Sequence, residues 1–150
     1  MNHIQMHDIW GSILVGLVAI TIGSLVTEPT RQKSMAIILA GASGSYFNDG
    51  LGIYEIPLSA AILLCAGIGL RFYPAIGVGW LLHTTSDVLH HSIGQPIISF
   101  LPTSSIGCAV CDVVLAVWFF MKAPSVFNLW RRTDIQEPSS VRETTSGKNT

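Results

Sequence analysis

The residues of this sequence that could carry out chemistry concentrate in the segment 83–91, His-Thr-Thr-Ser-Asp-Val-Leu-His-His. In a helix each residue turns the side-chain direction by about 100°, so the polar side chains of this segment fall within about one third of the circumference. The side chains on this stripe are His83, Ser86, Asp87 and His90. Imidazole and carboxylate groups placed together can exchange protons or bind a metal ion. The segment therefore predicts one chemically active helix face.

A further carboxylate, Asp112, lies in the next apolar segment, on a narrow face with Cys108 and Cys111. Counting about 1.5 Å per residue from the predicted outer helix ends, His83 and Asp112 both lie some 12 Å deep. An uncompensated Asp near the centre of a bilayer costs roughly 2.5 to 3.5 kcal/mol on insertion scales. We therefore expect Asp87 and Asp112 to share one interior site with His83.

Our leading hypothesis is that this site is the centre of an intramembrane enzyme acting on a lipidic or apolar substrate. The predicted catalytic residues are His83, Asp87, Asp112 and Glu55, and the predicted cavity residues are Asn48, Asp49, Trp80, Ser86 and Cys108. A divalent metal, Zn or Fe, suits such ligands and would activate a water molecule. The metal ligands on this hypothesis are His83, Asp87, His90 and His91. Without a metal, a carboxylic acid and a histidine would act as general acid and general base.

Two simpler interpretations of the same residues remain open. His83 could pair with Asp112 or Asp87 only to join two helices, a contact worth about 0.6 kcal/mol on average in membranes. Alternatively, the chain could be a non-enzymatic binding or channel subunit that assembles as a homo-oligomer around a polar cavity. Mutating the polar stripe would then change binding or permeation, and no turnover would exist.

The string Cys108-Ala109-Val110-Cys111 suggests a different activity. It is similar to the CxxC pair of quinone-coupled thiol oxidoreductases of the vitamin K epoxide reductase type, in which the pair would donate electrons to a quinone. That class also needs a cysteine pair in an outer loop, whereas Cys65, the third cysteine, lies inside an apolar segment. Ordinary core packing competes with this hypothesis, because cysteine is a common small apolar core residue.

The elements that must position these groups are apolar. Hydrophobic residues make up 49% of the chain and charged residues 11%, with a mean hydropathy of +0.52, whereas soluble domains carry about 25% charged residues. We therefore predict an all-α integral membrane bundle whose partners are membrane lipids and an apolar small molecule. The net charge of -1 argues against nucleic-acid binding, which needs a basic patch.

Polar breaks divide the chain into five predicted transmembrane helices, over about residues 9–26, 35–47, 54–70, 74–91 and 104–121. Ser34 stands where an N-cap of the second helix would, and Pro57 lies in the first turn of the third, where a missing N–H costs nothing. The second helix would reach only some 20 Å, so the turn at 48–52 is expected to border a cavity. The bundle covers 1–125, and 126–150 is predicted to form an interfacial anchor and a disordered cytoplasmic tail.

The basic residues set the predicted orientation. With five helices, one side of the membrane receives Arg31, Lys33, Arg71, Lys122, Arg131 and Arg132. By the positive-inside rule this side is cytoplasmic, so the N-terminus is external and the C-terminus cytoplasmic. Small residues at four-residue spacing predict close-packing helix faces; they are Ser12, Gly16, Ala19, Gly23, Ala40, Gly41 and Gly44.

Three strings of the sequence carry a family resemblance. They are 48–52, Asn-Asp-Gly-Leu-Gly, with Glu55; 77–84, Gly-Val-Gly-Trp-Leu-Leu-His-Thr, with Asp87, His90 and His91; and 102–105, Pro-Thr-Ser-Ser, with 107–109, Gly-Cys-Ala, and Asp112. Over about residues 35–125 the chain resembles a family of small bacterial and fungal membrane proteins classified as a domain of unknown function. The resemblance implies the same set of site residues, and the family brings no established activity.

Overall fold

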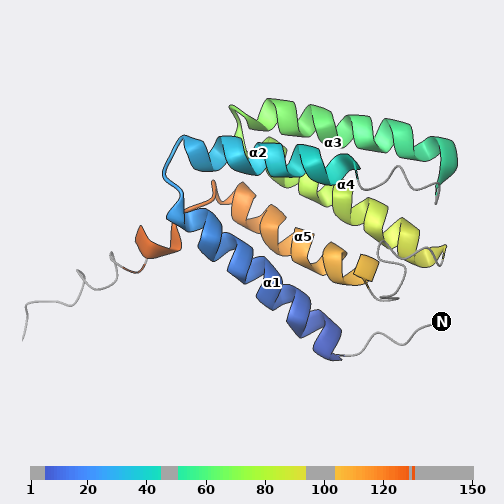
Figure 1. Cartoon of the computed structure of the whole chain (residues 1–150), viewed down its shortest axis with the longest axis horizontal. Helices are drawn as coiled ribbons and strands as arrows, with labels where there is room; N and C mark the ends of the chain where they lie inside the picture. Colours follow the sequence, from blue (N-terminus) through green and yellow to red (C-terminus); the bar gives the residue numbers. More distant parts are fainter. Residues whose placement is uncertain (1–5, 45–50, 94–103, 129, 131–150) are drawn as a thin grey trace, which may run out of the picture.

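The computed structural model describes residues 6–44, 51–93, 104–128 and 130, and within them the chain is helical with no strand. The elements are α1 (Met6–Leu25), α2 (Thr30–Ser43), a 3-10 turn η2 (Gly52–Tyr54), α3 (Glu55–Gly69), α4 (Tyr73–Ser92) and α5 (Ser104–Phe120). The predicted all-α class is confirmed. Figure 1 shows the helices running alternately in opposite directions, so that consecutive helices are antiparallel.

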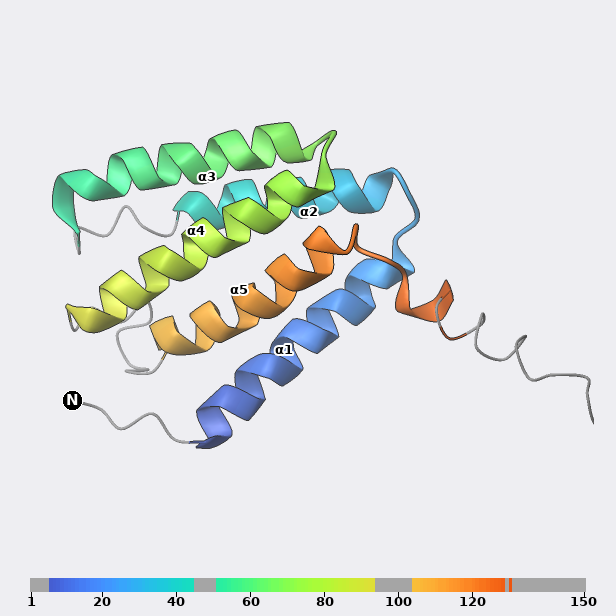
Figure 2. The same ribbon diagram turned by 180° about the vertical axis from the view of Figure 1, so that it is seen from behind.

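The helices pack in an order that differs from their order in the chain. α5 lies between α1 and α4, α4 packs on its other side against α3, and α2 covers α3 and α4. Figure 2 shows the same order from behind. α4 therefore occupies the middle of the bundle, with packed neighbours on three sides, and this is the helix that carries the predicted polar stripe.

The start of α2 differs from the prediction. The sequence places it after Ser34, but α2 begins at Thr30 and its N-cap position is Pro29. The polar residues of the first turn find partners there: the Gln32 side-chain amide donates to the carbonyl oxygen of Gly69 at 2.9 Å, at the end of α3. Polar character in this turn therefore reflects packing between helix ends, and it does not mark a loop.

Two glycines bring α4 close to its neighbours just before the stripe begins. A Cβ added at Gly77 would lie 3.1 Å from the carbonyl oxygen of Ala116 on α5, and one at Gly79 would meet the Leu39 side chain of α2. The predicted packing faces are confirmed at Gly16 and Gly23, where a Cβ would meet side chains of other helices. The prediction of a packing face is wrong at Gly41 and Gly44, where a Cβ would meet nothing within 4 Å.

The outer faces of the helices are rich in exposed large hydrophobic side chains. On α1 and α3 the exposed fraction is 62% for Leu14, 61% for Val15, 61% for Ile56 and 65% for Leu64. By length and apolar composition, one helical stretch among the described residues, Gly52–Gly69, could cross a membrane, and shorter apolar helices cover Ile9–Leu25 and Ser104–Phe120.

Candidate functional site

The polar stripe of α4 faces the interior of the bundle. Its four residues are all buried, with exposed fractions of 6% for His83, 0% for Ser86, 0% for Asp87 and 4% for His90. Thr85, which belongs to the same segment but not to the stripe, is exposed. Helical phase predicts this division correctly, and it places His83 and Asp87 on successive turns of one face.

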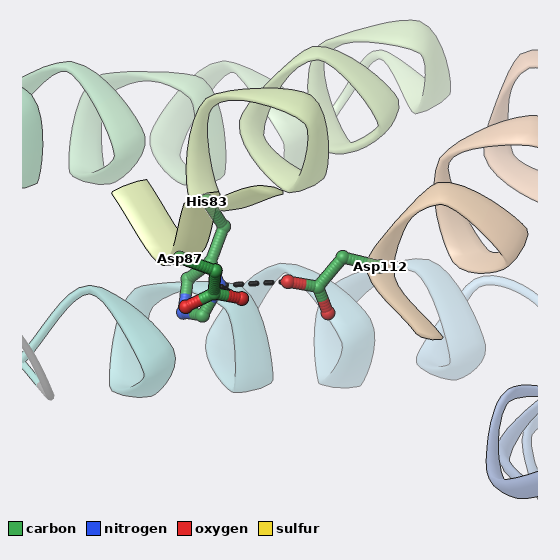
Figure 3. Close-up of side chains that lie close together, drawn as sticks. All are labelled: His83, Asp87 and Asp112. Atoms are coloured by element: carbon green, nitrogen blue, oxygen red, sulfur yellow. Dashed lines mark hydrogen bonds and ion pairs between the residues drawn. The ribbon is translucent and has the colours of Figure 1, made fainter. Parts of the chain in front are cut away.

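α5 supplies the second carboxylate. Oδ2 of Asp112 lies 2.7 Å from Nδ1 of His83, and Oδ2 of Asp87 lies 3.5 Å from the same nitrogen. Figure 3 shows the three side chains converging, with Asp112 reaching from α5 toward the imidazole on α4. One ligand atom from each residue can be chosen so that all lie within 4.8 Å of one another. We call His83, Asp87 and Asp112 the central cluster.

The other ring nitrogen of His83 contacts the backbone of α2. Nε2 lies 3.4 Å from the carbonyl oxygen of Ala42, which can only accept a hydrogen bond, so this geometry places a hydrogen on Nε2. The ring also packs against the indole of Trp80, with the two centroids 5.6 Å apart. The orientation of His83 is therefore fixed from three sides, and Nδ1 faces the two carboxylates.

The charge of the central cluster does not balance by itself. A separation of 2.7 Å between Nδ1 and Oδ2 of Asp112 is a hydrogen-bond length, so one proton lies between these atoms. If that proton is assigned to the imidazole, one positive charge faces two carboxylates. A low-dielectric interior strongly disfavours the remaining negative charge. The cluster therefore has a demand for one more proton or for a cation.

A second buried pair lies toward the C-terminal end of α4. Nε2 of His90 is 3.4 Å from Oε1 of Glu55, and Nδ1 of His90 is 2.9 Å from the carbonyl oxygen of Ser86. Glu55 begins α3, is 3% exposed, and accepts a hydrogen bond from the backbone N–H of Leu51 at 2.9 Å. A carboxylate at a helix N-terminus is also stabilised by the helix dipole.

The predicted set of metal ligands changes accordingly. Among the described residues, the group able to hold a metal is His83, Asp87 and Asp112, and neither His90 nor His91 belongs to it. The reason is distance along the helix, because His90 follows His83 by seven residues, or about 10 Å. His90 pairs with Glu55 instead, and His91 is only half-buried.

The predicted cavity residues have different outcomes. Asn48 and Asp49 lie outside the described residues. Trp80 packs against the ring of His83, and Ser86 is a buried residue that precedes Asp87 in the sequence. Among the described residues neither Trp80 Nε1 nor Ser86 Oγ has a hydrogen-bond partner, although both atoms are buried. A surface hollow within the described part of the chain lies elsewhere, at the C-terminal end of α3 and the turn after it, where it is lined by Leu63, Leu64, Gly67, Ile68, Leu70, Arg71 and Phe72.

The three cysteines are free thiols and all are half-buried. Cys108 and Cys111 lie one turn apart on α5, the helix that carries Asp112, whereas Cys65 lies on α3 near the closest approach of α4 at Gly79. No cysteine of the described residues is therefore in a disulfide.

A polar cluster at the opposite end of the bundle was missed by the sequence analysis. Glu28 accepts hydrogen bonds from Tyr73 and from Arg31, whose Nε lies 2.7 Å from Oε1. Burial raises the pKa of Glu28, but these hydrogen bonds outweigh it and hold the pKa below its ordinary value. The signal available in the sequence was a Glu and an Arg three residues apart beside a proline.

Comparison with known proteins gives one match. The model of a family described as "Family of unknown function (DUF6010)" matches residues 7–125, which include every described residue of the central cluster. No curated protein and no solved structure matches this chain.

Proposed function

This chain belongs to the DUF6010 family of unknown function, and we propose that it is an integral membrane enzyme with the central cluster as its acid–base centre. The substrate we propose is a lipid or another apolar small molecule. The observation that carries this proposal is the burial of a histidine and two aspartates within bonding distance of one another, in a chain with an apolar exterior.

The membrane assignment is supported by what the exterior exposes. A soluble monomer rarely exposes contiguous apolar patches larger than a few hundred Å², whereas α1 and α3 expose Leu and Val or Ile side chains along their outer faces. α4 is 20 residues long but carries the polar stripe, which lowers its hydropathy although the stripe faces inward. A multi-pass bundle explains an inward polar face together with outward apolar faces.

The proposed orientation rests on the position of the basic residues. All Lys and Arg residues in the described ranges lie at one end of the bundle, where α1, α3 and α5 end; they are Arg31, Lys33, Arg71 and Lys122. Glu55, His90 and His91 lie at the other end. The positive-inside rule makes the basic end cytoplasmic, so that the N-terminus is external.

The proposed mechanism is proton transfer at the imidazole. Asp112 holds the hydrogen at Nδ1 of His83, and Asp87 offers a second carboxylate oxygen to the same nitrogen. Such a pair of carboxylates around one imidazole can hold one proton more or one fewer with little movement of the heavy atoms. A general acid and base of this kind contributes typically 10²- to 10⁴-fold to a rate. Isomerisation, cyclisation or hydrolysis of an apolar substrate fits this chemistry.

The experiment that tests the proposal uses isotopic labels. Purified protein is reconstituted in vesicles of a total membrane lipid extract, incubated in D₂O or in H₂¹⁸O, and the lipids are analysed by mass spectrometry. We expect a lipid species that gains deuterium or ¹⁸O with the wild type and is at least about 100-fold slower to do so with Asp112→Asn. Thr85→Val is the matched control, because Thr85 is an exposed residue of the same helix.

Two results would overturn this function. One is a wild-type protein that labels no lipid above empty vesicles, in extracts from several kinds of membrane. The other is an Asp112→Asn variant that labels lipids as fast as the wild type does.

A further inference from the structure

We propose that the central cluster is a binding site for one divalent transition-metal ion of the Zn²⁺ class. This inference rests on the proposed function and deepens it, because the bound ion would take the place of the proton on Nδ1 of His83 and supply the acid at the same site. The donor atoms would be Nδ1 of His83 and one carboxylate oxygen each from Asp87 and Asp112, which lie within 4.8 Å of one another.

The donor spacing is close to what such an ion requires. Bonds of about 2.0 to 2.2 Å in a tetrahedral site place two donor atoms about 3.3 to 3.6 Å apart. Nδ1 of His83 is 3.5 Å from Oδ2 of Asp87 and 2.7 Å from Oδ2 of Asp112. Of the two separations that involve Nδ1, the one to Asp87 therefore already has the required length, and the one to Asp112 needs to lengthen by about 0.6 to 0.9 Å.

The surroundings of His83 are those of a metal ligand. Histidines that bind metals usually donate their other N–H to a carbonyl or carboxylate, which fixes the ring orientation. Here Nε2 faces the Ala42 carbonyl oxygen at 3.4 Å, and Trp80 packs against the ring. The nitrogen left for a metal is Nδ1, and it points at both carboxylates.

The charge of the site also favours a dication. With a neutral imidazole and two carboxylates, a divalent ion makes the site neutral. The Lys and Arg residues of the described ranges lie at the far end of the bundle, near the start of α2 and beyond the ends of α3 and α5. One nitrogen and two carboxylate oxygens suit Zn²⁺, Fe²⁺ or Mn²⁺ better than Ca²⁺, which prefers oxygen ligands alone.

Metal binding would replace the proton that now lies between Nδ1 and Asp112. In this exchange the cluster, with His83 as imidazolium, takes up one M²⁺. The products are the metal complex of neutral His83 and one H⁺. Metal affinity should therefore rise with pH, and one proton should be released per ion bound.

The test is metal titration of the purified chain in lipid nanodiscs after removal of metals with a chelator. We expect one equivalent of Zn²⁺ to bind with release of one proton, measured by calorimetry in two buffers of different ionisation enthalpy. Asp112→Asn and Asp87→Asn should each weaken binding at least about 100-fold, since the loss of groups that only orient a ligand already costs 10- to 100-fold. Glu28→Gln and Thr85→Val should bind as the wild type does.

A measurement on the unmodified chain guards against variants that fail to fold. Co²⁺ bound in place of Zn²⁺ should give the visible absorption typical of a tetrahedral site. Binding of Co²⁺ should also raise the unfolding temperature of the protein. Wild-type protein that binds less than half an equivalent of either ion, or an Asp112→Asn variant that folds and binds equally well, would overturn the proposal.

The metal site and the proposed enzyme can fail separately. A protein that binds no Zn²⁺ or Co²⁺ and still labels lipids at the full rate would contradict the metal proposal and leave the proposed enzyme unaffected. A protein that binds one Zn²⁺ through the central cluster and labels no lipid would end the enzyme and leave the metal site standing.

Discussion

Asp112 on α5 reaches across to His83 on α4, with Oδ2 of Asp112 2.7 Å from Nδ1 of His83, so that one contact joins the two central helices. Both side chains are buried, at 6% and 4% exposure. A buried charge-assisted contact of this kind is costly to break from one side, because the remaining partner keeps its charge without compensation.

The first prediction concerns this coupling. His83→Ala should destabilise the protein by about 3 to 5 kcal/mol, because two buried carboxylates lose their common partner. Asp112→Asn removes one of those charges. Adding His83→Ala to an Asp112→Asn variant should therefore cost less stability than His83→Ala costs in the wild type. A double-mutant cycle on unfolding in detergent measures the difference, and strictly additive losses would contradict the coupling.

The second prediction concerns the approach of α4 to α5. Gly77→Ala should destabilise by about 1 to 3 kcal/mol, because its Cβ would lie 3.1 Å from the Ala116 carbonyl oxygen. Gly67→Ala on α3 is the control, since a Cβ there meets nothing within 4 Å and alanine favours a helix by up to about 1 kcal/mol. Equal effects of the two changes on unfolding would show that helix proximity at Gly77 is unimportant.

The third prediction concerns pH at the basic end. Hydrogen bonds from Tyr73 and Arg31 lower the folded-state pKa of Glu28 below its ordinary value of 4.5. The stability that Glu28 contributes is therefore fully present above that ordinary value, and it is lost as the pH falls through the lowered folded-state pKa. The stability difference between wild type and Glu28→Gln should shrink on acidification below about pH 4.5. A difference that grows on acidification would have the wrong sign.

The fourth prediction separates acid–base chemistry from thiol chemistry. If the central cluster carries the activity, Cys111→Ala should keep the lipid-labelling rate, and Cys108 and Cys111 should remain reduced when the protein is exposed to a quinone. If the chain is a quinone-coupled oxidoreductase, the same variant should be inactive and mass spectrometry should find a disulfide between the two in the wild type.

The fifth prediction is topology. A reporter fused after Asn149 should be active only in the cytoplasm, and a tag before Met1 should be accessible from outside. Termini on the same side, or a C-terminal reporter active only outside, would exclude a bundle that crosses the membrane five times.

The central cluster could be predicted from the sequence because two properties of a helix are enough to locate it: the angle between successive side chains and the rise per residue. Helical phase puts His83 and Asp87 on one face, and counting residues from the outer helix ends brings Asp112 to the depth of His83. The same counting, applied to His90 and His91, would have separated them from His83. The contact of His83 with Ala42 was out of reach, since any residue offers a backbone carbonyl and only the packing of α2 on α4 selects this one.

The start of α2 was mispredicted for a related reason. Residues 30–34 are polar in sequence, and polar residues indicate a loop unless their partners are known. Gln32 bonds to the end of α3 and Arg31 to Glu28, so tertiary contacts compensate the polarity of a helical turn that local sequence disfavours.

The most direct measurement of the central claim is the lipid-labelling rate of single and double variants of the central cluster. If the three residues act as one centre, His83→Gln and Asp112→Asn should each lose at least about 100-fold, and the double variant should lose little more than either alone, because residues that act as a unit are strongly non-additive. Thr85→Val should keep the wild-type rate throughout. Losses that multiply in the double variant, or no loss in either single variant, would contradict the account.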